Sequence, residues 1–343
     1  MTIGVVILNW NGLKLLKQFL PDVIKFSPEA TIYVADNAST DRSVQYVKEN
    51  FPEVTVIINE VNGGYAKGYN DALTQVPEDI FVLLNSDVQV TPHWLEPIHR
   101  IFETREEVAA VQPKILDYME PEYFEYAGAA GGFIDRFGYP YCRGRIFENI
   151  EKDTGQYNDE IEIFWASGAC LAIRKKSFYE AGALDEDYFA HQEEIDLCWR
   201  LFNLGHKVRY TPASVVYHVG GATLNSMNPK KTFYNFRNSL FNLVKNLPSQ
   251  NLIPVLFVRM ILDGIAAFKF LFAGRFDHFS AVFKAHLNFY KQWPVLARKR
   301  KILPKRLGYF SKNSVVCTHY LYGIKKWSRP LVTIRYFALR FIL

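Results

Sequence analysis

The segment Ile80-Phe81-Val82-Leu83-Leu84-Asn85-Ser86-Asp87 joins five consecutive apolar residues to a polar end. An apolar run of this length predicts a strand that is buried on both faces, as in a parallel sheet with helices on each side. Ligands of open α/β sheets bind beyond the carboxyl ends of the strands. Asp87 is therefore a candidate ligand for a metal or a phosphate-bearing molecule. The alternative is that Asp87 only caps the following turn.

Helix and strand patterns alternate on both sides of this segment. Apolar runs predict strands, and apolar residues at helical spacing predict helices. The predicted strands are 2–8, 31–35, 54–59, 80–84, 165–174 and 208–217, and the predicted helices are 13–26, 43–50, 68–75 and 193–204. Residues 111–159 show no regular pattern. The β-α-β-α order predicts an α/β fold with a mostly parallel, doubly wound sheet.

The composition excludes several classes of protein. Hydrophobic residues make up 49% of the chain, which excludes a disordered protein. The cysteines at 142, 170, 198 and 317 lie far apart and form no CxxC pair. This argues against a zinc cluster or a disulfide framework and suits a reducing compartment. Residues 1–9 have neither a basic segment nor a cleavage site, so they predict a first core strand and not a signal peptide.

The charge is distributed unevenly along the chain. The 40 Lys+Arg and 35 Asp+Glu residues give a net charge of +5, but residues 231–343 hold 20 of the basic residues and only 2 of the acidic ones. Residues 1–230 therefore hold 20 basic and 33 acidic residues. Parts that differ this much in charge are expected to contact different partners.

The basic part contains a long apolar segment, residues 252–272, which includes Arg259, Asp263 and Lys269. At 100° per residue these charges fall within one arc of about 120°, which favours a helix lying in the membrane interface over one that crosses the bilayer. A polybasic cluster at 298–301 and 305–306 is of the type attracted to anionic headgroups. Residues 327–343 again mix apolar residues with arginines. Nucleic-acid binding is the competing interpretation, but the long apolar stretches favour a membrane surface and no nucleic acid.

Polar clusters follow four of the predicted strands, and they begin at Asn9, Asp36, Asn62 and Asn85. Each cluster alone is a plausible turn, but four clusters at one edge of a sheet would line a crevice of nucleotide size. A carboxylate at Asp36 can accept the N–H of a pyrimidine ring, and Lys67 could neutralise a phosphate. The spacing matches neither GxGxxG nor GxxxxGK[ST], so neither a dinucleotide fold nor a P-loop is supported.

Several motifs, in this order and spacing, resemble those of family 2 glycosyltransferases of the GT-A fold, close to the bacterial rhamnosyltransferase-like branch. They are Asn9-Trp10-Asn11-Gly12, Asp36-Asn37-Ala38-Ser39-Thr40-Asp41, Asn62-Gly63-Gly64-Tyr65 and Asn85-Ser86-Asp87. The resemblance covers about residues 2–240. It implies a divalent cation, Mg²⁺ or Mn²⁺, that bridges the diphosphate of a nucleotide-sugar. Asn85 replaces the first Asp of the DxD-like motif, which leaves Asp87 as its carboxylate metal ligand. The implied donor-binding residues are Asn9, Asp36, Asn37, Asp41, Asn62, Gly64, Lys67, Asn70, Asn85 and Ser86.

Residues 193–200 resemble the E-D-x-D-L-x-x-R segment of that family. The family's general base maps onto Glu194, and Glu193 is the reserve candidate. Inverting transfer needs a carboxylate that deprotonates the acceptor hydroxyl. The alternative is an acidic first helical turn favoured by the helix dipole, with Asp196 and Arg200 paired at i, i+4. That alternative explains Asp196 and Arg200 but leaves the two adjacent glutamates unexplained.

Three further features follow from the resemblance. His218 is implied as a contact of the metal or the diphosphate. Trp165 and Gly168 are implied on the acceptor side. Arg237 and Asn238 form a family feature whose role is not evident from the residues alone.

We therefore predict a GT-A catalytic domain in residues 1–240 and a basic amphipathic helical tail, which associates with a membrane, in residues 241–343. The expected activity is inverting transfer of a sugar, with rhamnose as a candidate, from a nucleotide-diphosphate donor to a hydroxyl of a glycan or lipid-linked acceptor. This activity would serve cell-surface polysaccharide assembly at the inner face of the cytoplasmic membrane. One alternative is a nucleotidyltransferase on a related fold, which would require a second metal-binding carboxylate near Asp87. The other is a non-catalytic member that binds a nucleotide-sugar or a membrane, which the presence of Asp87 and both glutamates disfavours.

Overall fold

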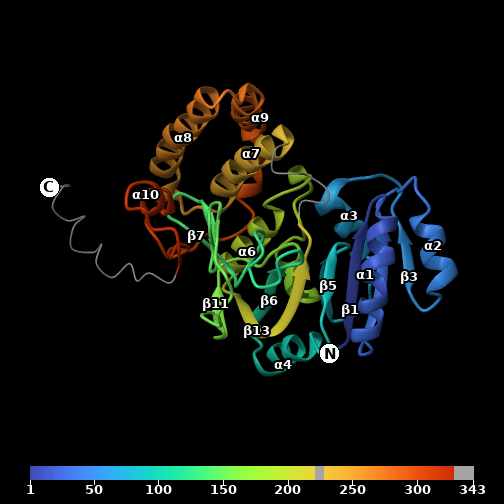
Figure 1. The fold of residues 1–343 in the computed structure, drawn as a ribbon. Helices are drawn as coiled ribbons and strands as arrows, with labels where there is room; N and C mark the ends of the chain where they lie inside the picture. Colours follow the sequence, from blue (N-terminus) through green and yellow to red (C-terminus); the bar gives the residue numbers. More distant parts are fainter. Residues whose placement is uncertain (221–227, 328–343) are drawn as a thin grey trace.

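The computed structural model describes residues 1–220 and 228–327. A large sheet lies between two layers of helices, and three long helices form a further layer at the end of the molecule opposite the N-terminus (Figure 1). The strands are β1 (Ile3–Asn9), β2 (Ala30–Asp36), β3 (Thr55–Ile58), β4 (Ile80–Asn85), β5 (Val88–Val90), β6 (Val108–Asp117), β7 (Gly132–Ile134), β8 (Pro140–Cys142), β9 (Arg145–Ile146), β10 (Asn149–Ile150), β11 (Ile161–Ile163), β12 (Cys170–Arg174) and β13 (Lys207–His218). The helices are α1 (Leu13–Phe26), α2 (Ser43–Asn50), α3 (Gly64–Leu73), α4 (Leu95–Thr104), α5 (Lys175–Glu180), α6 (Glu193–Leu204), α7 (Pro229–Asn246), α8 (Ser249–Phe272), α9 (Phe276–Arg300) and α10 (Val315–Tyr320), together with the 3-10 turn η1 (Glu186–Tyr188).

The main sheet has the strand order β11-β13-β6-β12-β4-β1-β2-β3, with β5 paired to β13. β1 pairs in parallel with both β2 and β4, and β2 pairs in parallel with β3. β6 and β13 are parallel to each other, whereas β12 is antiparallel to β4 and β6. The five apolar residues 80–84 are fully buried, as expected of a central strand covered on both faces. The predicted α/β fold is confirmed.

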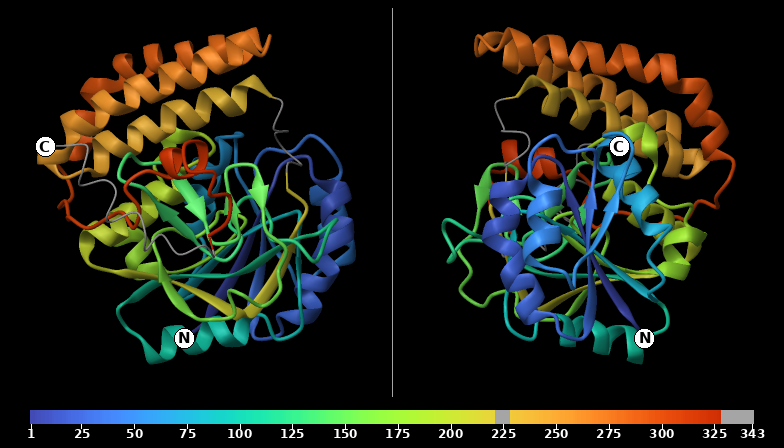
Figure 2. Two further views of the ribbon diagram at one scale, coloured as in Figure 1. Left: turned by 60° about the vertical axis from the view of Figure 1, so that its left-hand side comes forward. Right: turned by 90° about the vertical axis from the view of Figure 1, so that its right-hand side faces the viewer.

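Two hydrophobic cores lie on opposite faces of the sheet. Successive side chains of a strand point to opposite faces, and β1 accordingly divides its residues between the two cores. Val5 and Ile7 pack with α1, α2 and α4, whereas Val6 packs with α3, α5, α6 and α7. Figure 2 shows the helices on both sides of the sheet. At the carboxyl ends of the parallel strands, Asn9 and Asp36 are buried, whereas Asn85 at the end of β4 is partly exposed.

Residues 111–159, for which no regular pattern was predicted, contain regular secondary structure. They contain most of β6 and a small antiparallel sheet with the order β10-β9-β8-β7. β6 is a buried strand although it carries Gln112, Pro113 and Lys114. Gln112 accepts the N–H of Ser167 at 2.8 Å, and Lys114 pairs with Asp153 at 2.6 Å. The strand was not predicted because buried polar residues, whose partners are distant in sequence, interrupt its apolar pattern.

The C-terminal helices differ from the prediction in two respects. α7 runs through residue 240, so the boundary predicted there falls inside a helix. The polybasic cluster largely contacts the protein itself: Lys299 pairs with Asp185 and Asp187, and Arg300 donates to the carbonyl of Val244. The acidic front half supplies the two carboxylates, and α7 supplies the carbonyl. Residues 328–343 of the predicted last amphipathic stretch lie outside the described residues. In the described part, no helix is both long enough and apolar enough to cross a bilayer.

Candidate active site

The polar clusters meet at the carboxyl edge of the sheet. In the strand register, Asn9 lies opposite Asp36, and Leu8 lies opposite Asn85. The amide of Asn9 donates to Asp36 Oδ1 at 2.9 Å, and Asp36 Oδ2 accepts the N–H of Ser39 at 2.9 Å. The sheet therefore gathers the ends of β1, β2 and β4 at one edge, as predicted from the sequence.

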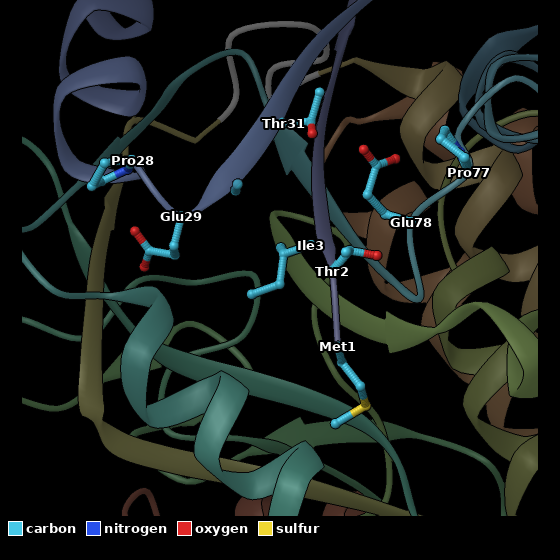
Figure 3. A pocket seen from close by; sticks show the side chains of 9 residues that line it. Met1, Thr2, Ile3, Pro28, Glu29, Thr31, Pro77 and Glu78 are labelled. Atoms are coloured by element: carbon cyan, nitrogen blue, oxygen red, sulfur yellow. The ribbon is translucent and has the colours of Figure 1, made fainter.

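A separate cavity of about 520 Å³ lies at the opposite edge, around the amino ends of β1 and β2 (Figure 3). Its lining includes Glu29 and Glu78. The carboxylate of Glu78 accepts a hydrogen bond from the hydroxyl of Tyr33 at 3.1 Å, and burial together with this contact raises the pKa of Tyr33 to about 12. Ligands of such sheets bind at the carboxyl ends of the strands. We therefore place the candidate site at the other edge.

His218 lies beside Asp87 because β13 pairs with β5, which brings His218 opposite Val88. Asp87 Oδ1 lies 3.1 Å from His218 Nε2, and Glu125 Oε1 lies 3.4 Å from His218 Nδ1. All three side chains are buried. Burial lowers the pKa of His218, but the contacts with Asp87 and Glu125 outweigh it and raise the pKa to about 10. Two buried carboxylates thus converge on one ring and favour its protonated form, so a cation bound at Nε2 would have to displace that proton.

The pair of Asp87 and His218 fits a divalent cation. Their separation of 3.1 Å is close to the roughly 3 Å edge of an octahedron with 2.1 Å metal–ligand bonds. Within residues 1–220 and 228–327, no group of three or more His, Cys, Asp or Glu side chains could hold a metal ion by itself. Mg²⁺ is commonly held by one or two protein ligands together with substrate phosphates and water. The two side chains therefore suit a cation that a bound diphosphate helps to hold.

Tyr65 joins three of the predicted segments. Its N–H donates to the carbonyl of Phe189 at 2.8 Å, and its hydroxyl donates to the carbonyl of Gly168 at 2.8 Å. The preceding Gly64 has φ +78°, and a Cβ on it would lie 2.3 Å from the carbonyl oxygen of Phe189. Glycine is required at this close approach. The loop after β3, the turn at Gly168 and the segment before Glu193 therefore meet at one residue.

The two glutamates open α6 after a strained turn. Phe189, His191 and Gln192 all have positive φ, between 63° and 71°, which is unusual for residues other than glycine. Burial raises the pKa of Glu194 to about 7, against the opposing effect of backbone N–H groups at the start of the helix. Burial and the neighbouring charge of Glu194 raise the pKa of Glu193 well above its usual range. Glu194 is partly exposed, whereas Glu193 is buried.

The family follows from a comparison with known proteins. The family model described as "Glycosyl transferase family 2" matches residues 4–182, about half of the chain. The chain belongs to this family. The matched residues include Asp36 and Asp87 and end before Glu193, Glu194 and His218. The roles of all five residues stay predictions.

The curated relatives of this family member are distant, and the chain spans just under two thirds of the first relative. It is 27% identical over 205 residues to the N-acetylglucosaminyl-diphospho-decaprenol L-rhamnosyltransferase of Mycobacterium tuberculosis. That alignment covers 55% of this chain and 66% of the relative. It is also 26% identical over 186 residues to the pre-mycofactocin glycosyltransferase of the same species, over 53% of this chain and 36% of the relative.

Solved structures share the fold. GalNAc-T7 with UDP, GalNAc and Mn²⁺ superposes with a TM-score of 0.57 at 17% identity, over 73% of this chain and 48% of that chain. Mannosyltransferase PcManGT from Pyrobaculum calidifontis, in complex with GDP-Man and Mn²⁺, superposes with a TM-score of 0.51 at 14% identity, over 87% and 84% of the two chains. The GT-A-like fold of the glycosyltransferase is confirmed.

Several predicted donor-binding residues form hydrogen bonds within the glycosyltransferase. Lys67 pairs with Asp71 on its own helix at 2.9 Å. Asn70 exchanges hydrogen bonds with the backbone of Leu184, and Asp41 accepts the N–H groups of Leu13 and Ser43 at the starts of two helices. These contacts hold the loops together, and donor contacts for these residues stay predictions.

Some of the remaining predicted residues also form hydrogen bonds within the protein, and others are accessible to a ligand. Asn37 donates to Asn62 Oδ1, which also accepts the N–H of Gly64 and so shapes the loop. On the acceptor side, Trp165 is buried and donates to the carbonyl of Phe133, whereas Gly168 is partly exposed. Asn85 and Ser86 are also partly exposed, beside Asp87. Of these residues, Asn62, Gly64, Gly168, Asn85 and Ser86 are exposed or partly exposed, so a ligand can reach them.

The sequence did not indicate Glu125. It lies in the stretch without a regular pattern and reaches His218 because its N–H donates to the carbonyl of Ile115 in β6, the strand that pairs with β13. A carboxylate on the second ring nitrogen of a metal-binding histidine commonly fixes its tautomer. Glu125 therefore lies where it can orient the ring of His218.

The structure also shows which groups Arg237 and Asn238 of α7 contact. The amide of Asn238 donates to the carbonyls of Tyr188, Ala190 and His191 at 3.2, 3.0 and 2.7 Å. Arg237 donates to the carbonyls of Asp187 and Tyr188 at 2.9 and 3.0 Å. These bonds hold the strained turn that precedes the two glutamates. No local sequence pattern could have revealed contacts across about fifty residues.

Proposed function

We propose that the protein transfers a sugar from a nucleotide-diphosphate donor to an acceptor hydroxyl with inversion, in one in-line displacement. The observation that carries the proposal is the convergence on one sheet edge of a buried Asp87–His218 pair and, across Tyr65, of the turn that leads into Glu193 and Glu194. The first group suits a diphosphate with its cation, and the second suits proton removal from an acceptor. Donor and acceptor sites on adjoining loops are what a single displacement requires.

Asp87 and His218 would hold Mg²⁺ or Mn²⁺ against the diphosphate of the donor. The cation would neutralise the charge that develops on the leaving nucleoside diphosphate. Glu125 would keep the ring of His218 in the orientation that presents Nε2 to the site. The predicted base contact of Asp36 and the loop that begins at Asn62 would hold the nucleotide.

Glu194 is the better candidate for the general base. A base works best when its pKa lies near the operating pH, and the pKa of Glu194 is raised to about 7. Glu193 is more deeply buried, and its Oε2 has no hydrogen-bond partner among the described residues. Burial and the neighbouring charge of Glu194 raise the pKa of Glu193 well above the usual range, which favours its protonated form. Glu193 would then help to keep the neighbouring carboxylate in place.

We propose a glycan or lipid-linked acceptor, reached at the inner face of the cytoplasmic membrane during cell-surface polysaccharide assembly. The mycobacterial relative is named as a rhamnosyltransferase acting on a decaprenol-linked substrate, which supports this choice and makes rhamnose the first donor sugar to test. The basic C-terminal region, with 20 basic and 2 acidic residues in 231–343, supports a membrane surface as a partner.

The test is a donor screen with UDP-, GDP- and dTDP-sugars in the presence of Mg²⁺ or Mn²⁺, with and without a lipid-linked acceptor. We expect release of a nucleoside diphosphate from one donor class, abolition by a chelator, and loss of at least 10²-fold of the rate in Asp87→Asn. The matched control is Glu49→Gln, an exposed carboxylate on α2. Release of inorganic diphosphate from a nucleoside triphosphate and a sugar phosphate would instead support a nucleotidyltransferase.

A further inference from the structure

An exposed apolar surface covers the hairpin of α8 and α9. Ten large apolar residues each expose between 50% and 86% of their surface, and we call them the outer face: Ile253, Phe257, Ile261, Ile265, Phe268 and Phe272 on α8, and Phe276, Phe283, Leu287 and Tyr290 on α9. The two rows adjoin each other, because Phe268 packs against Phe279 of α9 and the hydroxyl of Tyr290 contacts Met260 of α8. Soluble proteins rarely expose apolar patches beyond a few hundred Å². A surface of this kind calls for a partner.

Two of the three clustered charges of α8, Arg259 and Asp263, face inward, whereas Lys269 is exposed. Arg259 and Asp263 are almost fully buried and pair with each other at 3.3 Å. Arg259 donates to Ser239 of α7 at 2.7 Å and to the carbonyl of Phe137 at 3.0 Å. Asp263 accepts the hydroxyl of Tyr139 at 3.1 Å. Arg259 and Asp263 therefore bind the protein, and the apolar arc faces away from it.

This network fixes the rotation of α8 about its axis. His286 of α9 lies 3.3 Å from Asp263, so both helices of the hairpin share the network. Breaking a buried ion pair by moving one partner leaves an uncompensated charge, which is strongly unfavourable. The hairpin therefore cannot turn its apolar residues inward without exposing or orphaning these charges. The apolar outer face is a fixed property of the fold.

The charges beside the outer face indicate an anionic partner. On α9, Lys284, Lys291 and Arg298 are exposed at seven-residue intervals along the apolar row, and Lys269 is exposed on α8. In contrast, the outer arc of α8 from Ile253 to Phe272, about 120° wide at 100° per residue, carries no charged residue. An apolar stripe with a basic border matches the interface of an anionic bilayer. A second copy of the chain would bring the same positive border against itself.

The outer face and the candidate site lie toward the same end of the molecule. β1 begins beside the N-terminus, at the end farthest from the hairpin, so the carboxyl ends of β1, β2 and β4 point toward the hairpin (Figures 1 and 2). α7 connects the two regions, because Ser239 contacts Arg259 while the adjacent Asn238 holds the turn before Glu193. A surface bound by the hairpin therefore lies near the acceptor side of the site.

We propose that the outer face of the α8–α9 hairpin inserts into the interface of an anionic membrane and thereby presents the active site to a hydroxyl of a lipid-linked acceptor. This inference rests on the proposed transfer function and adds the surface through which the acceptor is reached. The Phe, Ile and Leu side chains enter the acyl boundary, and Lys284, Lys291 and Arg298 contact phosphate headgroups. The buried Arg259–Asp263 pair holds the face in this orientation.

The test measures binding of the full-length protein to vesicles of phosphatidylcholine with and without phosphatidylglycerol. We expect binding that requires phosphatidylglycerol and that weakens by at least about tenfold in Phe257→Gln/Ile261→Gln. The matched control is Met119→Gln/Ile150→Gln, which replaces two exposed apolar residues elsewhere. Lys284→Glu/Lys291→Glu/Arg298→Glu should remove the preference for the anionic lipid, whereas Lys14→Glu/Lys25→Glu/Lys48→Glu should not. Thermal unfolding verifies that each variant is folded.

Activity separates the two proposals. We call Phe257→Gln/Ile261→Gln the outer-face variant. It should keep the wild-type transfer rate with a water-soluble acceptor analogue, and it should lose most of that rate when the acceptor is embedded in vesicles. If the wild type binds vesicles but consumes no donor, the transfer function fails while the membrane surface stands. If the outer-face variant binds anionic vesicles like the wild type, the membrane proposal is wrong. It is also wrong if the wild type ignores vesicles and forms a dimer that the variant disperses, because a second copy then covers the face.

Discussion

Helices α6 and α8 each carry an acidic and a basic residue four positions apart, and both pairs are buried against α7. In α6, Asp196 pairs with Arg200 and with Lys245 of α7, each at 2.8 Å. In α8, Arg259 pairs with Asp263 at 3.3 Å and donates to Ser239 of α7. The first network fixes the helix that presents two glutamates to the site. The second fixes a helix that presents an apolar face to the outside.

The two networks differ in which residues of their helix stay free to contact another molecule. Asp196 of the α6 pair lies in the same first turn as Glu193 and Glu194, so the rigidity of the pair determines where two titratable carboxylates point. The α8 pair lies in the middle of a long helix, on the side opposite an arc without charges. The same local motif, an i, i+4 ion pair, thus serves a chemical site in one place and an interaction surface in the other.

The largest expected effect concerns the carboxylates that the α6 network presents. Glu194→Gln should lower the transfer rate by about 10²- to 10⁴-fold, because the amide cannot accept the proton of the acceptor hydroxyl. The measurement is the steady-state rate with the best donor, with unfolding followed to verify the fold. Glu193→Gln is the matched control and should lose less. A larger loss in Glu193→Gln would assign the base to Glu193.

The next effect distinguishes the two networks directly. Asp196→Asn and Asp263→Asn should each lower the free energy of unfolding by about 3–5 kcal/mol. Each substitution removes the negative charge that compensates a buried basic side chain. Urea denaturation measures this loss. Only Asp196→Asn should also lower the rate with a water-soluble acceptor in the fraction that is folded. Equal losses of rate in both variants would contradict the separation of roles.

A smaller effect tests the link through α7. Asn238→Ala removes the donor that holds three carbonyls of the turn before Glu193, at a cost of about 1–3 kcal/mol. We expect a lower kcat with an unchanged KM for the donor, since the turn carries the base and not the nucleotide. Asn50→Ala, which loses one exposed hydrogen bond on α2, is the control. A change confined to stability would show that Asn238 does not position the base.

The smallest effect is the pH profile. The general base must be deprotonated, and burial raises the pKa of Glu194 to about 7. Activity should therefore fall as the pH decreases through about 7, reaching roughly a tenth of its plateau one pH unit lower. Rates with a saturating donor between pH 5.5 and 8.5, about the range in which such a group titrates, measure this. A profile that is flat through this range would exclude Glu194 as the base.

Much of the fold and part of the site followed from local patterns. The helices 13–26, 43–50 and 193–204 were predicted with the bounds that the structure has, because amphipathic spacing and end signals are local. The buried strand ending at Asn85 predicted the sheet edge at which Asp87 lies. In contrast, β6 escaped prediction because Gln112 and Lys114 are buried with partners that are distant in sequence.

The sequence by itself determined the α/β fold, the family and the grouping of polar residues at strand ends, since periodicity and order along the chain suffice for these. Tertiary structure decided which atoms face each other: Glu125 toward His218, Asn238 toward the turn before Glu193, and Lys67 toward Asp71. It also decided which way α8 faces. Periodicity shows that Arg259 and Asp263 share a side of a helix, but only the partners Ser239 and Tyr139 turn that side inward. The physical reason is that a helix pattern defines faces, whereas the environment selects which face is buried.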